Sequence, residues 1–299
     1  MRSAGKTNKP DRSPLPRWPV YRHVIFDCDS TLTAIEGIDE LANHPDSQRQ
    51  VADLTRSAMD GEVNLEAVYG ERLEILQPTR GAVRALRSRY RKHVVEDAAA
   101  LIQALQALGH EVYIVSGGLF DPVREFGLHL GIAPEHIRAV EVEYDTLSGN
   151  WWQGQGPWHE AYLAVQHSVL TESDGKARVI RELLQNQTGR SLLVGDGVSD
   201  LLASREVDFF AGFGGVVCRD RVASESKVFI QSQSIAPVLL LAAGPAALEY
   251  SDDPVVQGLV EKALALTSSS ALHWNEVQLA EKFESCFGTP AKTGSERKL

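Results

Sequence analysis

Cysteine is scarce in this chain, which has only Cys28, Cys218 and Cys286 among its 299 residues. Thiols this few and this widely separated exclude a disulfide framework and a zinc site built from cysteine. A reducing compartment fits such usage best, so we expect a cytoplasmic protein. Import into an organelle, directed by the N-terminal segment, stays open as an alternative.

An excess of positive charge is also missing, since 30 Lys and Arg stand against 40 Asp and Glu, a net charge of −10. Broad binding to nucleic acid or to anionic membranes needs a basic surface, so neither partner is expected. The longest apolar run, residues 235–248, is too short to span a bilayer and is interrupted by Pro237, Gly244 and Pro245. Residues 1–20 lack the apolar centre of a secretory signal and are expected to be a flexible, solvated tail.

Three short apolar runs are typical of buried parallel strands, and each is followed by a polar or glycine-rich segment. Residues 23–26 precede DCDSTL, residues 112–115 precede SGG, and residues 192–194 precede GDGVSD. Helical sequence lies between them. This alternation predicts an α/β fold with a doubly wound, Rossmann-like parallel sheet.

The order of these segments predicts how the chain is organised. The tail of 1–20 leads into a catalytic core made of 21–33 and 95–243. Residues 34–94 are rich in helical sequence and stand between the first two strands, so they are expected to form an inserted helical cap. Residues 244–299 are expected to form a C-terminal helical extension.

Several smaller elements are expected in the second half of the chain. Alternating residues over 139–152, with Ser-Gly-Asn at 148–150, predict a β-hairpin. Apolar spacing predicts helices over 254–264 and 272–283. We expect these helices to pack on the core, because exposed apolar stripes are uncommon on monomers; a homo-oligomer formed through them is the alternative.

Four carboxylates follow the predicted strands. Asp27 and Asp29 come after the first strand, and Asp196 and Asp200 come after the third. Parallel strands end at one edge of a sheet, where ligands bind, so these side chains are expected to gather there. Asp27 and Asp29 alone are equally typical of a turn or a helix cap. Four clustered acids instead favour a Mg²⁺ site beside a nucleophilic carboxylate, which indicates phosphoryl transfer.

Phosphoryl transfer also needs hydrogen-bond donors and positive charge around the phosphate oxygens. Ser116 and the backbone N–H groups of Gly117 and Gly118 follow the second strand and can donate. Lys176, at the start of a predicted helix, supplies a positive charge. Taken singly, Ser-Gly-Gly is usually a turn and a lysine is usually a solvated surface residue.

In this order DCDSTL, VSGG, Lys176 and GDGVSD resemble the four motifs of the haloacid dehalogenase superfamily of phosphatases, over about residues 22–243. Four further segments resemble the phosphoserine phosphatase branch: 36–42, 54–78, 172–180 and 212–222. The resemblance implies Mg²⁺-dependent hydrolysis of a small phosphorylated metabolite through an aspartyl-phosphate. Within that branch the implied substrate is O-phospho-L-serine.

The resemblance also implies roles for the acids. Asp27 matches the nucleophile, and Asp29 matches the general acid that protonates the leaving alkoxide and then activates water. Mg²⁺ would be held by Asp27, the backbone carbonyl of Asp29, and Asp196, with Asp200 nearby.

The substrate-binding roles are implied in the same way. Ser116, Gly117 and Lys176 match the residues that bind phosphate. Glu36 matches the residue that meets the substrate ammonium, and Arg72 the one that meets its carboxylate. Ser199 falls at a substrate-binding position where many relatives carry Asn or Thr.

Other interpretations of these residues stay open. Glu36 is also typical of an acid at a helix N-terminus, and Arg72 of an ion pair along a helix. The segment 139–160 departs from the branch, so another phosphorylated metabolite is a second candidate substrate. A non-catalytic module that binds phosphate or metal and signals is a third hypothesis.

Overall fold

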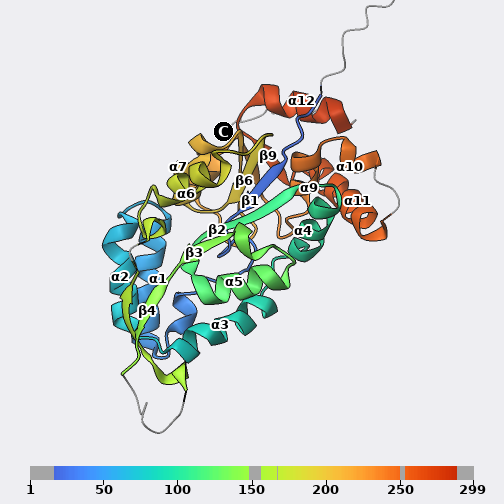
Figure 1. The fold of residues 1–299 in the computed structure, drawn as a ribbon. Helices are drawn as coiled ribbons and strands as arrows, with labels where there is room; N and C mark the ends of the chain where they lie inside the picture. Colours follow the sequence, from blue (N-terminus) through green and yellow to red (C-terminus); the bar gives the residue numbers. More distant parts are fainter. Residues whose placement is uncertain (1–16, 148–155, 167, 250–252, 288–299) are drawn as a thin grey trace, which may run out of the picture.

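The computed structural model describes residues 17–147, 156–166, 168–249 and 253–287. In the described residues a seven-stranded sheet has the order β3-β2-β1-β6-β7-β8-β9 (Figure 1). The strands are β1 (His23–Phe26), β2 (Glu111–Leu119), β3 (Ile137–Val140), β6 (Ser191–Gly195), β7 (Phe209–Phe213), β8 (Val228–Ile230) and β9 (Leu272–Trp274). All neighbours pair in parallel except β8 and β9. The predicted doubly wound α/β fold is confirmed.

Helices cover both faces of this sheet because successive residues of a strand point to opposite faces. Val24 and Phe26 of β1 belong to one hydrophobic cluster, and Ile25 belongs to the other. The first cluster includes side chains from α4 (Ala98–Ala107), α5 (Phe120–His129), α9 (Pro237–Ala243) and α11 (Pro254–Ser268). The second includes side chains from α6 (Gly175–Leu184), α7 (Val198–Ala203) and α8 (Asp220–Glu225).

The helical insertion lies beyond the carboxyl ends of the strands (Figure 1). It contains α1 (Pro45–Met59), α2 (Leu65–Leu76) and α3 (Arg80–Lys92). Its two ends are tied together, since Ala34 N–H donates to His93 O at 2.7 Å and Val95 N–H donates to Leu32 O at 3.0 Å. The insertion is therefore attached to the core through two adjoining stretches of backbone.

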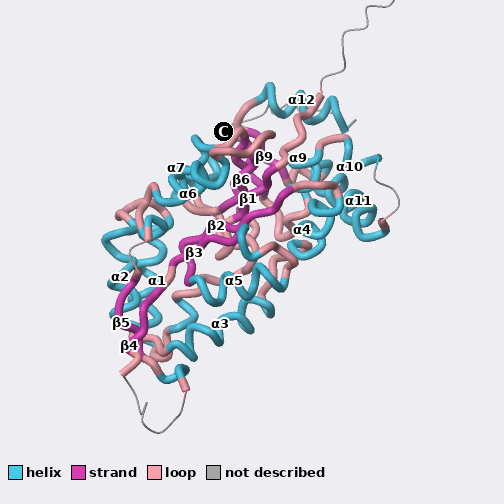
Figure 2. The backbone as a smooth tube through the Cα atoms, in the orientation of Figure 1, coloured by secondary structure: helices cyan, strands magenta, loops and turns pink. Residues whose placement is uncertain are grey.

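A two-stranded antiparallel hairpin of β4 (Val142–Asp145) and β5 (Ala161–Val165) extends from the far end of the molecule (Figure 2). The first half of the hairpin predicted over 139–152 is present, but its partner strand comes later in the chain, and the predicted turn at 148–150 lies outside the described residues. Tyr162 N–H donates to Pro78 O at 3.0 Å, and Arg80 N–H donates to Glu160 O at 2.9 Å. The hairpin thus bonds to the insertion, although it falls in the range 95–243 that was assigned to the core.

The predicted helix over 272–283 is wrong in its first residues, and the C-terminal extension contains a strand in addition to its helices. Leu272–Trp274 forms β9 on the edge of β8, and α12 begins only at Val277 and ends at Phe287. Edge pairing is decided by the free hydrogen-bonding groups of β8, which local apolar spacing does not reveal. Trp274 packs against Trp18 and Phe283.

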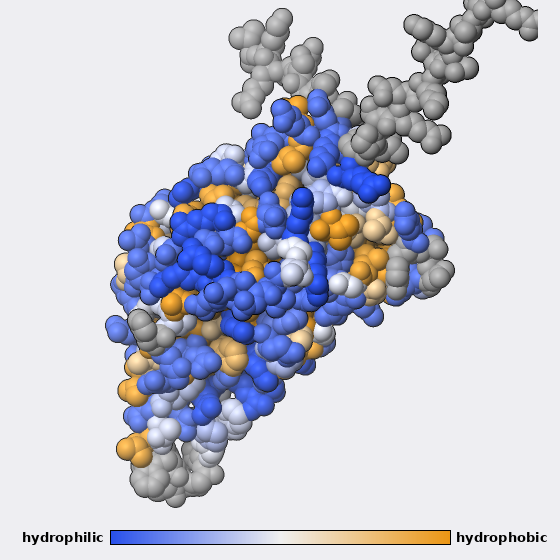
Figure 3. Space-filling model, turned by 45° about the horizontal axis from the view of Figure 1, so that its top comes forward, coloured by the Kyte–Doolittle hydropathy of each residue, from blue (hydrophilic) through white to orange (hydrophobic). Residues whose placement is uncertain are grey.

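The other C-terminal helix packs within the chain, because Val256, Leu259, Val260 and Ala263 of α11 are buried against the core. A short α10 (Ala246–Glu249) precedes it. Hydrophilic residues dominate the face seen in Figure 3, with hydrophobic ones scattered among them. No helix among the described residues is long and apolar enough to cross a bilayer.

Candidate active site

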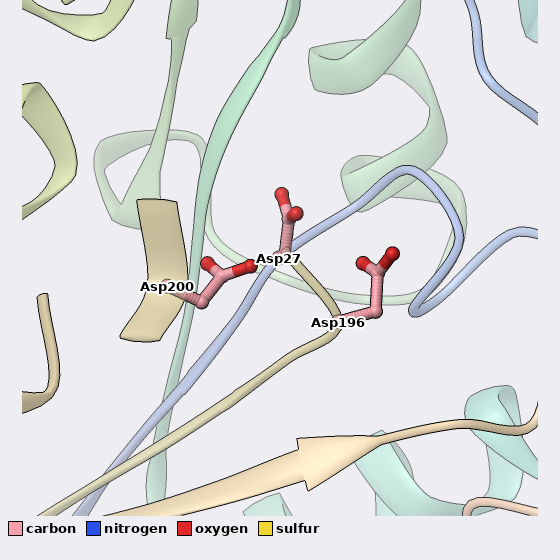
Figure 4. Close-up of side chains that lie close together, drawn as sticks. All are labelled: Asp27, Asp196 and Asp200. Carbon is pink, nitrogen blue, oxygen red and sulfur yellow. The ribbon is translucent and has the colours of Figure 1, made fainter. Parts of the chain in front are cut away.

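Three buried carboxylates converge at the carboxyl edge of the central strands. Asp27 directly follows β1, Asp196 directly follows β6, and Asp200 lies in the first turn of α7. One carboxylate oxygen from each lies within 4.8 Å of the others, and Asp27 stands between the other two (Figure 4). The neighbouring position of β1 and β6 in the sheet explains why residues so distant in sequence meet.

Lys176 balances part of this negative charge. Its Nζ lies 2.8 Å from Asp27 Oδ2 and 2.7 Å from Asp200 Oδ1, and all three side chains are buried. Burial alone lowers the pKa of Lys176, but Asp200 and Asp27 outweigh this effect and raise that pKa above its usual value. The lysine is therefore held in its charged form.

Local packing at the start of α6 places Lys176. The preceding residue must be glycine, since a Cβ at Gly175 would lie 1.6 Å from the carbonyl oxygen of Val169. Without a side chain at that position, the first turn of α6 can approach the short helix Val169–Thr171 and direct Lys176 toward β1.

The acids retain unsatisfied acceptors that suit a divalent cation. Among the described residues, Asp196 Oδ2 is buried without a hydrogen-bond partner, while Asp196 Oδ1 accepts from the Thr31 hydroxyl at 3.0 Å. Burial raises the pKa of Asp196 well above its usual range, and Arg219 only partly opposes this. A bound cation with oxygen ligands would offset the cost of burying these carboxylates and their repulsion of one another. The set of carboxylate oxygens therefore fits Mg²⁺.

Asp29 lies apart from the three converging carboxylates. Its Oδ2 accepts from the Gly37 N–H at 3.2 Å, and its Oδ1 has no hydrogen-bond partner among the described residues. Burial, followed by the nearby charge of Glu36, raises the pKa of Asp29 to about 8. A carboxyl that keeps its proton near neutral pH can act as a general acid.

The Ser-Gly-Gly segment lies inside a strand and not in a turn. β2 continues through it to Leu119, and its pairing with β3 is irregular between Val115 and Leu119. Ser116 is fully buried, and its hydroxyl accepts from the Gly118 N–H at 2.9 Å. Ser116 and Gly117 line the same cavity as Asp27 and Lys176.

This cavity lies between the core and the helical insertion and has room for about one water molecule. It is lined from the core by Asp27, Asp29, Ser116, Gly117, Gly118, Leu170, Glu172, Lys176 and Ser199, and from residues 36–72 by Glu36, Ile38, Met59, Leu65, Tyr69 and Arg72. All residues expected to bind substrate or phosphate therefore line this one cavity: Glu36, Arg72, Ser116, Gly117, Lys176 and Ser199.

Glu36 and Arg72 bring opposite charges to this cavity. Arg72 is 3% exposed and donates through Nη1 to the Thr55 hydroxyl at 3.0 Å, while its Nε has no partner among the described residues. Arg72 is directed toward Thr55 of α1, which speaks against the alternative of an ion pair along its own helix. Glu36 accepts from the Ser30 hydroxyl at 2.7 Å.

Arg219 is a site residue that the sequence did not single out. It is buried, with Nη2 at 3.4 Å from Asp196 Oδ2 and 3.6 Å from Glu36 Oε1. The segment 212–222 contains two basic residues, Arg219 and Arg221, but only the fold shows that Arg219 returns to the acids. Arg219 thus connects the proposed metal ligands to the residue expected to meet the ammonium.

The chain is similar to known proteins over most of this architecture. A family model described as haloacid dehalogenase-like hydrolase matches residues 21–208. The phosphoserine phosphatases of Homo sapiens and Drosophila melanogaster are 32% and 30% identical over 209 residues each, which is 69% of this chain and 88% and 73% of those proteins. The chloroplastic phosphoserine phosphatase of Arabidopsis thaliana is 29% identical over 220 residues. The match covers 73% of this chain and 71% of the Arabidopsis protein.

A similar solved structure is described as the phospho-aspartyl intermediate analogue of phosphoserine phosphatase. It has a TM-score of 0.63 and 21% identity, and it covers 74% of this chain and 98% of its own. At this identity, the likeness concerns the fold.

Proposed function

The chain belongs to the haloacid dehalogenase-like hydrolase family, and on that premise we propose that it hydrolyses O-phospho-L-serine to L-serine and phosphate. Its relationship to the phosphoserine phosphatases makes it a phosphoric monoester hydrolase. The observation that carries the substrate assignment is the pair of opposite charges, Glu36 and Arg72, in the cavity that also holds Asp27 and Lys176. An amino-acid head group presents the complementary ammonium and carboxylate.

In the proposed reaction, the Asp27 carboxylate attacks phosphorus and the bond to the serine oxygen breaks. Asp29 gives its proton to the leaving alkoxide, and L-serine departs. Asp29 then takes a proton from water as the water attacks the aspartyl-phosphate, which releases phosphate and restores Asp27. The raised pKa of Asp29 supports its starting this cycle protonated.

Lys176, Ser116 and the Gly117 N–H are proposed to hold the phosphate oxygens, with Ser199 at the edge of the same cavity. We propose Asp27, Asp196 and the backbone carbonyl of Asp29 as the Mg²⁺ ligands, with Asp200 nearby. When bound, Mg²⁺ would neutralise negative charge on the nucleophile and on the phosphate. In the proposed enzyme, residues 34–94 form a cap over a catalytic core made of residues 21–33 and 95–243.

No observation favours a different phosphorylated metabolite over phosphoserine. That alternative rested on the unusual segment 139–160, yet none of its described residues lines the cavity. Trp158 instead lies against Arg84 of α3, with the guanidinium 4.3 Å from the ring centroid. We propose that the protein is located in the cytoplasm. Import into an organelle is the alternative, because the relative from Arabidopsis thaliana is chloroplastic.

The test is phosphate release from a panel of phosphomonoesters with and without Mg²⁺. We expect phosphoserine to have the highest kcat/KM, and both chelation and Asp27→Asn to abolish turnover. Asp220→Asn, which changes an exposed acid, is the control and should leave the rate unchanged. A protein inert toward every ester with Mg²⁺ would favour the non-catalytic module.

Arg72→Ala tests the substrate assignment separately. We expect it to lower kcat/KM for phosphoserine by about 100-fold, because a charge-assisted contact to the carboxylate is lost. Phosphoethanolamine, which has no carboxylate, should lose less than threefold. Equal losses of kcat/KM for both esters would show that Arg72 does not bind the substrate carboxylate.

A further inference from the structure

A tyrosine of the helical insertion reaches the buried acid Asp29. Tyr90 lies in the last turn of α3, yet its side chain is fully buried. Its ring stands edge-on to Phe126 of α5, with the ring centroids 5.5 Å apart at 75°. The ring is therefore anchored in the hydrophobic cluster of the core, on a helix that belongs to the insertion.

The hydroxyl end of Tyr90 meets the Asp29 carboxyl. Among the described residues, neither Tyr90 Oη nor Asp29 Oδ1 has a hydrogen bond of regular geometry, and both atoms are buried. Burial raises the pKa of Tyr90, and the charge of Asp29 raises it further. A buried donor without a partner is unfavourable, and the Asp29 carboxyl is a group with which this hydroxyl interacts, since each affects the pKa of the other.

Gly37 completes this arrangement. Its N–H donates to Asp29 Oδ2 at 3.2 Å, and a Cβ at this position would lie only 2.0 Å from Tyr90 Oη. The glycine therefore leaves the space that the hydroxyl occupies. One oxygen of Asp29 therefore accepts from a backbone N–H, and the other has no hydrogen-bond partner among the described residues.

We propose that Tyr90 is a positioning residue whose hydroxyl donates to Asp29 Oδ1 and fixes the orientation of that carboxyl during catalysis. The phenol keeps its own proton throughout. Asp29 alone passes a proton to the alkoxide oxygen and later takes one from water. The inference rests on the proposed function, because that function assigns Asp29 as the acid.

The experiment compares Tyr90→Phe with the wild type on two esters, O-phospho-L-serine and p-nitrophenyl phosphate. The serine alkoxide must be protonated to leave, whereas p-nitrophenolate leaves without a proton. A misplaced Asp29 should therefore lower kcat/KM about tenfold for phosphoserine and less than twofold for the aryl ester. The ratio of the two constants is measured on one preparation, so it does not depend on how much of the variant folds.

Tyr113→Phe is the matched control, since Tyr113 is also buried but donates to Glu111 at the start of β2, at 2.7 Å. It should leave the ratio at the wild-type value. Equal losses on both esters, or no loss on either, would overturn the role of Tyr90. Failure of the wild type on phosphoserine would instead refute the proposed substrate, and phosphoethanolamine would then serve as the alkyl ester that decides the role of Tyr90.

Discussion

At the scale of single residues, the site is a problem of charge burial. Asp27, Asp196 and Asp200 bring three carboxylates together, and Lys176 lies against two of them. Arg219 provides a second buried cation at 3.4 Å from Asp196. Buried charges persist in proteins only when they are paired or bind metal. Lys176, Arg219 and the expected Mg²⁺ together therefore compensate the negative charge of the three carboxylates.

The pKa of Asp29 predicts how stability depends on pH in the metal-free protein. Its folded value of about 8 lies above the value near 3.9 of an unfolded aspartate. Between these values the folded chain holds a proton that the unfolded chain has released. The Asp29 contribution to the free energy of unfolding therefore falls as the pH rises from about 4 to about 8.

Urea unfolding in EDTA across this range measures the effect, with Asp29→Asn as the comparison. The asparagine cannot ionise, so the variant should lose part of the downward slope. Parallel curves for the two proteins would show that Asp29 does not titrate above its ordinary range.

The residues that the sequence predicted and those that it missed differ in a physical way. Asp27, Asp196 and Asp200 follow strand ends, where the geometry of a parallel sheet makes a meeting at one edge predictable, whereas Asp29 was expected in the same cluster and lies outside it. Arg219 and Tyr90 reach the site through the return of a loop and the packing of a helix end. Such contacts depend on the whole fold, which a local pattern does not contain.

At the scale of elements, strands were predictable where they are buried on both faces. All four residues of β1 are buried, as a continuous apolar run in a parallel sheet requires. β9 could not be predicted, because three residues at a sheet edge carry almost no pattern of their own. Its place is decided by β8 and by the aromatic cluster of Trp18, Phe209, Trp274 and Phe283.

Trp18→Ala tests how this cluster fixes the two ends of the described chain. The indole N–H donates to Leu241 O at 2.8 Å, and the ring stands edge-on to Phe209 and Phe283. Losing a buried tryptophan should lower the free energy of unfolding by about 3–5 kcal/mol. KM should be unchanged, because Trp18 does not line the cavity.

Chemical denaturation and steady-state kinetics on the same sample measure both quantities. Val20→Ala, at an exposed position nearby, is the control and should change stability by less than about 0.5 kcal/mol. A large change in KM for Trp18→Ala would contradict the separation of this cluster from the active site.

At the scale of the whole molecule, the insertion and the core close over the site. The cavity between them has room for about one water molecule, which is less than a phosphorylated amino acid occupies. We expect the insertion to move relative to the core when substrate enters. Met59 and Leu65 are apolar residues of the 36–72 segment that line this cavity.

This closure predicts strong selection by size. O-phospho-L-tyrosine should have a kcat/KM at least about 100-fold below that of O-phospho-L-serine, because its ring prevents closure. Leu65→Ala should narrow the gap by enlarging the cavity, whereas Leu163→Ala, at an exposed position of β5, should not. Equal rates for the two esters in the wild type would show that closure does not select.

The contact of Trp18 with Phe283, at 5.0 Å between ring centroids, brings the beginning and the end of the described chain together on the side remote from the insertion. A chain with this property is suited to circular permutation. A short linker that replaces residues 1–16 and 288–299 would join residues 17 and 287 there, and new termini could be opened elsewhere without separating the strands that carry Asp27 and Asp196.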